Sequence, residues 1–588
     1  MKSLMWFKKK RGRRDRFGVL KIDMSKAYDR VNWNFLKAVL LAMNFDSKWI
    51  KWIMECVSTV EYTLLLNGSM TRSFKPSQGL RQGGPLSPYL FLLCANVLSI
   101  SLTQAEELKK IKGVKVGSSG LSFSHLLFVD DSLLFFRKDN VSIQNLQSIL
   151  NCTYSISGQS INLAKSYVFC SPNMPLEEQQ ALARTLQVNF VQHPSKYLGV
   201  HFKLKGYRIA DFQFRIDKLK AKLQGWKIKL LSQVSRTTLI TSVLQSLPLY
   251  TFACFKIPEY VCNKMDSIIR AFWWGHECSE NKLHLVHWDR VSQPEKFGGL
   301  GTKKFRHMNQ VMLHKQYWRI SQNPQLLLTK TFKARYFPAG TIQDCRSKPH
   351  YSWVWRSIIQ QENHLLKEGR WRVGNGYNIP LNHRNWFTHR SLHVPQNQLP
   401  TGNVGDLINH HNRMWKVDLV RNLYSFPQAT KILRIPISKT DSMHEKLLWK
   451  FSREGNYQVK RSYELCAEDI SRQSKPWQAQ NGWWRSFWKI KVPLKISIFI
   501  WKPLHNGLPT YLNLHIKGIT NVKCCPICNE EEESLTHLFL HCPFARACWH
   551  GSMLSIHTIE LNHISVQQWI KQLISSYNRN GVDSMCYL

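Results

Sequence analysis

The chain has 588 residues, of which 43% are hydrophobic and 20% are charged, so its composition excludes an intrinsically disordered protein and allows several domains with buried cores. Lysine and arginine number 81 against 38 acidic residues, and the net charge of +43 favours a polyanion such as nucleic acid as the partner. We find no run of about 18 apolar residues and no signal peptide, so we expect an intracellular protein, nuclear or cytoplasmic, with no membrane partner. In such a compartment the 15 cysteines are expected to be thiols, apart from any that bind a metal.

An acidic residue follows a short apolar strand near the start of the chain. Residues 20–29 read LKIDMSKAYD, and they follow a basic cluster in which seven of the nine residues 8–16 are lysine or arginine. A carboxylate beside apolar strands is costly to bury unless it is paired or holds a cation. Asp23 is therefore the first candidate metal ligand.

A glycine-rich loop comes next, with the sequence QGLRQGGPLSP at residues 78–88, and an apolar run to residue 100 follows it. Gly79, Gly83 and Gly84 allow the backbone to approach a ligand closely, and Pro85 and Pro88 suit the start of a helix. We expect a nucleotide base or a template strand to lie on this surface.

Two adjacent acids stand between β-forming stretches, in the sequence LFVDDSLLFF at residues 127–136. The pattern predicts two strands joined by a tight turn, with Asp130 and Asp131 at its tip. Such a pair is also common at hairpin turns that hold no metal, because Asp tolerates turn conformations. Together with Asp23, however, the pair offers the hard oxygen ligands that Mg²⁺ prefers, as in phosphoryl-transfer sites whose two ions lie roughly 3.5 to 4 Å apart.

In these motifs, their order and their spacing, the chain resembles the palm of reverse transcriptases, specifically those of plant LINE-type non-LTR retrotransposons. The resemblance implies an α+β fold, in which a palm of antiparallel sheet with helices is followed by mostly helical thumb and connecting regions and a small zinc-binding module. It also implies that two Mg²⁺ ions are held by three carboxylates: Asp23, Asp130 and Asp131. Tyr28 would screen the sugar 2′ position, and a strip beneath the nucleotide and template would comprise Arg81, Gln82 and Gly83.

Two further blocks extend the resemblance. Residues 157–166 look like the family's next motif, in which a lysine protonates the leaving pyrophosphate; Lys165 is the candidate, and an ordinary basic surface residue is the alternative. Residues 196–200 look like the primer grip, and Tyr197, Leu198 and Gly199 would form a turn that holds the primer 3′ end against the metals. Aligning that end makes the attack nearly unimolecular.

The region after the palm is basic and rich in tryptophan. Between residues 203 and 230 the apolar positions Leu219, Leu223, Trp226 and Leu230 recur at helical spacing, which predicts a thumb-like helix with a core stripe and a phosphate-facing side. A lysine-rich solubilising face is the alternative. Most of the 22 tryptophans are expected to lie in the core. The alternative is that tryptophan side chains stack on the bases of a nucleic acid.

A pattern C-x2-C-x8-H-x4-C near the C-terminus can close a tetrahedral, structural zinc shell. Its members are Cys525, Cys528, His537 and Cys542. Cys524 and His541 offer alternative ligands. A cluster of buried thiols that binds no metal is the alternative interpretation of the pattern. The flanking sequence resembles the zinc-binding module that follows such polymerases, and the acidic residues 530–533 are expected to form a solvated loop.

These observations predict five parts: a palm at residues 1–202 with the fingers largely missing, a thumb-like region at 203–290, a connecting region at 291–480, a zinc-binding module at 481–551 and a tail at 552–588. The resemblance implies an RNA-directed DNA polymerase that uses an RNA template, a DNA primer and dNTPs. Because only 22 residues precede Asp23, and Gly84 stands where these elements usually have Asp, a catalytically dead nucleic-acid-binding remnant is the alternative. An RNA-templated RNA polymerase is the third hypothesis, and Tyr28 argues against it.

Overall fold

A computed structural model describes the fold at residues 16–117, 121–192, 196–201, 209–226, 230–276, 283–342, 345–361, 368–377, 379–381, 386, 402–437, 445–473, 481–561 and 563–576. All of the basic cluster at residues 8–16 except its last residue lies outside these ranges. The chain divides into two compact units, Met1–Leu204 with Pro324–Cys345, and Lys205–Asn323 with Arg346–Leu588. We describe each unit by itself.

The first unit is built on a five-stranded sheet. Its strand order is β6 (His125–Phe128), β7 (Asp131–Arg137), β1 (Phe17–Asp23), β8 (Tyr167–Cys170) and β9 (Asn189–Phe190). Neighbouring strands are antiparallel, except that β8 and β9 are parallel. Because side chains alternate along a strand, β1 presents Leu20 and Ile22 to one face of the sheet and Val19, Lys21 and Asp23 to the other.

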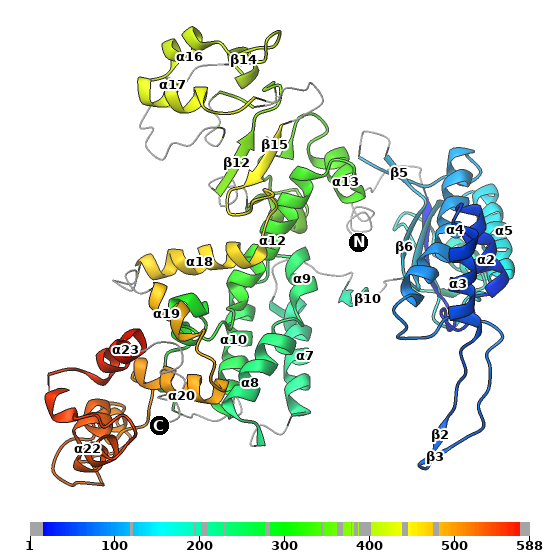
Figure 1. Ribbon diagram of the computed structural model, residues 1–588. Coiled ribbons are helices and arrows are strands. Elements are labelled where there is room, and N and C mark those ends of the chain that lie inside the picture. The colour runs from blue at the N-terminus through cyan, green and yellow to red at the C-terminus, as the bar shows by residue number, and fades with distance from the viewer. Residues whose placement is uncertain are drawn as a thin grey trace. The chain divides into compact units, whose positions relative to one another are not determined.

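Helices gather over the face that carries Leu20 and Ile22 (Figure 1). They are α2 (Trp33–Ala42), α3 (Ser47–Ser58), α4 (Ser87–Glu107), α5 (Asn140–Ser157) and α6 (Leu176–Thr185). Within the described residues, α4 is long and apolar enough to cross a membrane, but its side chains Phe91 and Leu98 lie in the core that the helices and the sheet share. One side of α4 therefore belongs to this core, although only 33% of its apolar window is buried.

Short hairpins complete the first unit. Their strands are β2 (Leu65–Leu66) with β3 (Ser69–Met70), β4 (Val114–Val116) with β5 (Leu121–Phe123), and β10 (Lys196–Tyr197) with β11 (Val200–His201). Helix α13 (Leu327–Tyr336) packs against β4 and β5. Val19, Leu133, Phe135 and Tyr197 form a second core on the other face of the sheet. The predicted α+β palm is confirmed.

The second unit is mostly helical, as predicted. Its helices include α7 (Gln213–Gln224), α8 (Gln233–Leu239), α9 (Leu249–Cys254), α10 (Glu259–Trp274), α12 (Phe305–Gln322), α14 (Trp353–Ile359), α16 (Val417–Leu423), α17 (Phe426–Leu433), α18 (Val459–Gln473), α19 (Asn481–Phe487), α20 (Leu494–Leu504), α21 (Tyr511–Ile516), α22 (Pro543–His550) and α23 (Val566–Ser576). Two small sheets pair β12 (Gly369–Arg372) with β15 (Lys446–Trp449) and β13 (Ile408–Asn409) with β14 (Met414–Trp415).

Most of the described tryptophans of this unit are buried, as expected. Those that are fully buried are Trp273, Trp355, Trp386, Trp449, Trp484 and Trp501. The predicted thumb-like stripe is correct at Leu219, which is buried, but wrong at Leu230, which is 78% exposed. The reason is that α7 ends at Gln224, so the helical spacing no longer applies at residue 230.

Candidate active site and metal centre

Three predicted carboxylates meet at one end of the palm sheet. Asp23 is the last residue of β1, and it pairs in register with Asp131, the first residue of β7. Asp130 precedes Asp131 in the β6–β7 turn, where Val129 takes a left-handed conformation with φ of 53°. Asp130 is exposed, and the side chains of Asp23 and Asp131 are 28% and 27% exposed. The expected proximity of residue 23 to the acid pair is thus observed, on a surface that solvent and ions reach.

A lysine that the sequence analysis did not single out lies against these acids. Lys21 Nζ is 2.9 Å from Asp131 Oδ1 and 3.9 Å from Asp23 Oδ2, and its side chain is only 13% exposed. Tyr167 pairs with Lys21 on β8, and burial, followed by the negative charge of Asp131, raises the pKa of its phenol to about 12. Lys21 therefore neutralises part of the negative charge that the carboxylates concentrate here, and Tyr167 stays neutral.

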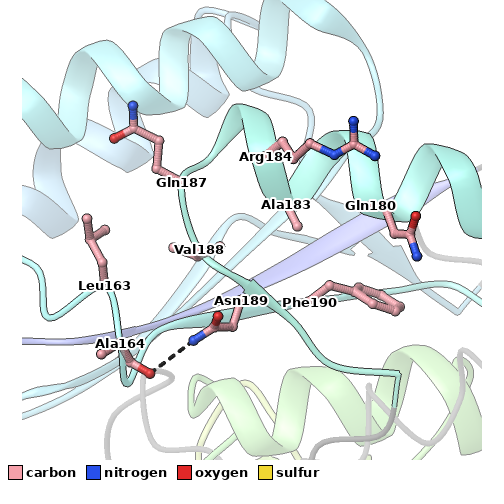
Figure 2. A pocket seen from close by; sticks show the side chains of 9 residues that line it. All are labelled: Leu163, Ala164, Gln180, Ala183, Arg184, Gln187, Val188, Asn189 and Phe190. Carbon is pink, nitrogen blue, oxygen red and sulfur yellow. Dashed lines mark hydrogen bonds between the residues drawn. The ribbon is translucent and has the colours of Figure 1, made fainter.

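The turn that carries Lys165 is fastened to Asp23. The backbone N–H of Asn162 donates to the carbonyl of Asp23 (2.8 Å), and the N–H of Asp23 donates to Ser166 Oγ (3.0 Å). Figure 2 shows the pocket beside this turn, about 560 Å³ in volume, where Asn189 Nδ2 donates to the carbonyl of Ala164 (3.1 Å). The turn is thus anchored to both β1 and β9, while the Lys165 side chain is exposed.

The glycine-rich strip docks on the segment that follows Asp23. The N–H of Leu80 donates to the carbonyl of Tyr28 (2.8 Å), and Gln82 Nε2 donates to Asp29 Oδ1 (3.2 Å). Gly79 has φ of 97°, and a Cβ there would lie 2.6 Å from the carbonyl oxygen of Asp29, so only glycine fits. The Tyr28 ring stacks on Phe91, with centroids 5.0 Å apart.

The other two residues of the strip that are expected to contact the nucleotide or template are exposed to solvent. Arg81 and Gly83 are exposed, and a Cβ on Gly83 would meet nothing within 4 Å.

The predicted primer grip is the hairpin of β10 and β11. Leu198 and Gly199 form its turn, with φ of 47° and 71°. Tyr197 is 6% exposed because its ring packs on the same sheet face that carries Lys21 and Asp23. The hairpin is therefore rooted in the sheet by Tyr197 and exposes Gly199.

Four potential metal ligands come together near the C-terminus. The ligand atoms of Cys525, Cys528, His537 and Cys542 all lie within 4.8 Å of one another, a spacing that suits a tetrahedral shell. Backbone N–H groups of Glu530 and Glu531 lower the pKa of the Cys528 thiol to about 7, which favours the thiolate that a metal needs. Cys524 and His541 lie outside this group of ligands.

The carboxylate site and the cluster of cysteines and histidine each lie in a segment that matches a known protein family. Residues 2–202 match the family described as reverse transcriptase (RNA-dependent DNA polymerase), and residues 457–549 match the family described as zinc-binding in reverse transcriptase. The chain thus contains a reverse-transcriptase domain at residues 2–202. The first match contains all three candidate carboxylates, and the second contains all four candidate zinc ligands.

Similar proteins come from plants and from retroelements. A protein of Arabidopsis thaliana described as a ribonuclease H protein is 26% identical over 57% of this chain and 54% of its own length. An uncharacterized mitochondrial protein of Arabidopsis thaliana is 32% identical over 26% of the chain and 99% of its own length. A Pol polyprotein from a type-2 retrotransposable element of Drosophila melanogaster is 25% identical over 49% of the chain and 27% of its own length. The chain thus spans about half of the first relative and about a quarter of the third.

One acid of the predicted solvated loop contacts a candidate zinc ligand. Glu531 Oε2 lies 2.8 Å from Nδ1 of His537, whose imidazole is buried and whose Nε2 lies 3.3 Å from Cys528 Sγ. A carboxylate on one ring nitrogen fixes the tautomer that directs the other nitrogen toward a metal. The side chain of Glu531 is 65% exposed, as expected of a solvated loop, although it also contacts His537. The expectation is wrong for Glu533, which is 9% exposed and accepts the N–H of Tyr511.

We expect Glu531→Ala to weaken zinc binding roughly tenfold to a hundredfold, because His537 loses the carboxylate that orients it. Competition between the full chain and a chromophoric chelator would measure the affinity. The matched control is Glu530→Ala, which removes a neighbouring charge from outside the cluster. An equal loss of affinity in both variants would attribute the effect to charge alone and contradict the orienting role.

Proposed function

We propose that this chain is an RNA-directed DNA polymerase of the non-LTR retrotransposon type, which extends a primer 3′-OH along an RNA template with dNTPs. The observation that carries this proposal is the register of β1 and β7, which sets Asp23 opposite Asp131 with Asp130 beside them. The family matches and the retroelement relatives support the same reaction.

The three carboxylates would hold two Mg²⁺ ions. Their fit rests on the donor set, three hard oxygen ligands at a partly exposed strand end. When bound, such ions lower the pKa of the attacking hydroxyl and neutralise charge that develops on the phosphates. Lys21 holds the Asp131 carboxylate in place, and the hydrogen bonds of Ser166 and Asn162 fix the backbone of Asp23.

Other residues would position the substrates. The Tyr28 ring, supported by Phe91, would exclude a 2′-hydroxyl, and Lys165 would give a proton to the leaving pyrophosphate from its anchored turn. A docked strip would lie beneath the nucleotide and template: Arg81, Gln82 and Gly83. A hairpin would hold the primer end: Tyr197, Leu198 and Gly199. This positioning makes the attack nearly unimolecular.

One Zn²⁺ would be held by Cys525, Cys528, His537 and Cys542, and all four of its positions would be filled by protein. Such a site is structural, because no open position remains for a substrate. We also propose that the protein acts inside the cell, in the nucleus or cytoplasm, with RNA and DNA as partners and without a membrane.

Primer extension tests the proposal. The purified chain would be incubated with poly(rA)-oligo(dT), dTTP and Mg²⁺, and the same preparation would be assayed for RNA retention at several salt concentrations. We expect template-dependent extension. RNA retention without synthesis would instead favour a catalytically dead nucleic-acid-binding remnant, a candidate that Gly84 supports because the carboxylate usual at this position is absent.

We expect Tyr28→Val to raise the ratio of rUTP to dTTP incorporation on poly(rA) roughly tenfold or more, because the ring that would fill the space of a 2′-hydroxyl is removed. Single-nucleotide extension with each substrate measures the ratio. Tyr89→Val is the control, since Tyr89 is 69% exposed and lies on α4 beyond the docked strip. If the ratio stays the same in Tyr28→Val, Tyr28 does not select the sugar.

A further inference from the structure

A basic cleft in the second unit lies outside the residues matched by the polymerase family. It has a volume of about 480 Å³ and is formed by the segment of residues 294–303, by α18 and by the end of α19 with the residues just after it. Its walls include five cationic side chains and two acidic ones. This volume lies in the range of ligand-binding pockets.

Most of the positive charge in the cleft is uncompensated. Lys296 Nζ contacts Glu464 Oε2 at 2.5 Å, and Arg461 Nη1 contacts the same oxygen at 2.8 Å, so Glu464 is already neutralised. Among the described residues, no carboxylate oxygen lies within 4.0 Å of the other cations that line the cleft. Those cations are Lys303, Lys460, Arg485 and Lys489.

Two of these cations, Lys303 and Lys460, lie close enough to repel each other. Lys303 is partly buried, and burial, followed by the positive charge of Lys460, lowers the pKa of its ammonium group. Gathering like charges in a concave site disfavours the free protein and raises the affinity for an anion. The cleft is therefore arranged for a negatively charged ligand.

An aromatic side chain adds a second feature. Trp488 lines the cleft, and its indole N–H is shielded from solvent without a hydrogen-bond acceptor in the described part of the chain. The ring therefore offers apolar surface to the cleft, while its buried donor contributes no contact to a ligand. Cations beside an aromatic ring form the surface that single-stranded nucleic acids recognise, through phosphates and bases respectively.

We propose that the cleft of Lys303, Lys460, Arg485, Lys489 and Trp488 binds the phosphates of single-stranded RNA. This site shares no residue with the palm carboxylates, and its existence does not depend on polymerase activity. An acidic polypeptide offers charge but no base that stacks on an indole, so the presence of Trp488 in the cleft wall favours RNA.

The test compares two variants of the full chain that lose the same charge. In the cleft variant Lys303, Lys460, Arg485 and Lys489 are replaced by Gln; in the control Lys264, Lys330, Lys495 and Lys517, exposed cations outside the cleft, are replaced by Gln. Binding of a 20-nucleotide RNA is measured against salt concentration. We expect the slope of log K against log salt to become shallower by about 2 to 3 in the cleft variant, because each lost phosphate contact removes about 0.7.

A mapping experiment on the unaltered chain accompanies the binding test. RNA that carries 4-thiouridine is photocrosslinked, and we expect crosslinked peptides from residues 294–303 or 460–489. Equal slopes in the two variants, or crosslinks that fall elsewhere, would overturn the proposal. Displacement of the RNA from these peptides by polyglutamate at equal charge would overturn it in favour of an acidic protein partner.

Discussion

Asp130→Asn is expected to lower primer extension by at least about a thousandfold while RNA affinity changes less than twofold. The substitution keeps the size of the side chain but removes the negative charge that a divalent cation needs at the β6–β7 turn. Catalysis of phosphoryl transfer depends almost entirely on such positioning and charge, so the loss is expected in turnover. Because Asp130 is exposed and packs into no core, the fold is expected to survive.

Steady-state extension on poly(rA)-oligo(dT) measures this effect, with RNA retention measured on the same preparation. Asp217→Asn serves as the control, since Asp217 is an exposed acid on α7 that contacts Gln213. Extension that persists unchanged in Asp130→Asn would exclude the carboxylate mechanism. A parallel loss of extension and of RNA binding would point instead to a folding defect.

The strands of the palm were predictable where the apolar alternation of the sequence corresponds to strands that pair in the sheet. The apolar alternation before Asp23 and on either side of the acid pair predicts the strands and the turn, and the structure has them as β1, β6 and β7. Lys21 was missed because its contact with Asp131 depends on strand register, which a single sequence does not reveal. The only available signal was its spacing of two residues from Asp23, which places both side chains on one face of β1.

Other contacts were missed because the chain folds back on itself. Residues 530–533 are all glutamate, so the sequence does not show which of them reaches His537. The fold brings Glu531 into contact with its imidazole. The basic cleft combines residues 303, 460 and 485, which are too far apart for any local pattern to join. The thumb-like stripe failed at Leu230 for the opposite reason, because a local spacing was extended past the end of α7.

Cys542→Ala is expected to eliminate zinc binding and to unfold the zinc-binding module. Cys525 and Cys542 are almost fully buried, and the buried members of the neighbouring core among the described residues are few: Leu535, Leu540, Val566 and Trp569. A core of this size gives little stability by itself. Structural Zn²⁺ contributes an apparent 10 to 16 kcal/mol to the folding of small zinc domains, so its loss is decisive here.

Zinc content by mass spectrometry and limited proteolysis would measure the two effects, with new cleavage expected between residues 505 and 576. Cys524→Ala is the matched control, because Cys524 is exposed and adjacent to the cluster but supplies no ligand atom to it. A strong chelator acting on the unaltered chain should reproduce the cleavage pattern of Cys542→Ala. Protection of residues 505–576 after complete zinc removal would mean that apolar packing alone maintains the module, and the metal would then be dispensable for its fold.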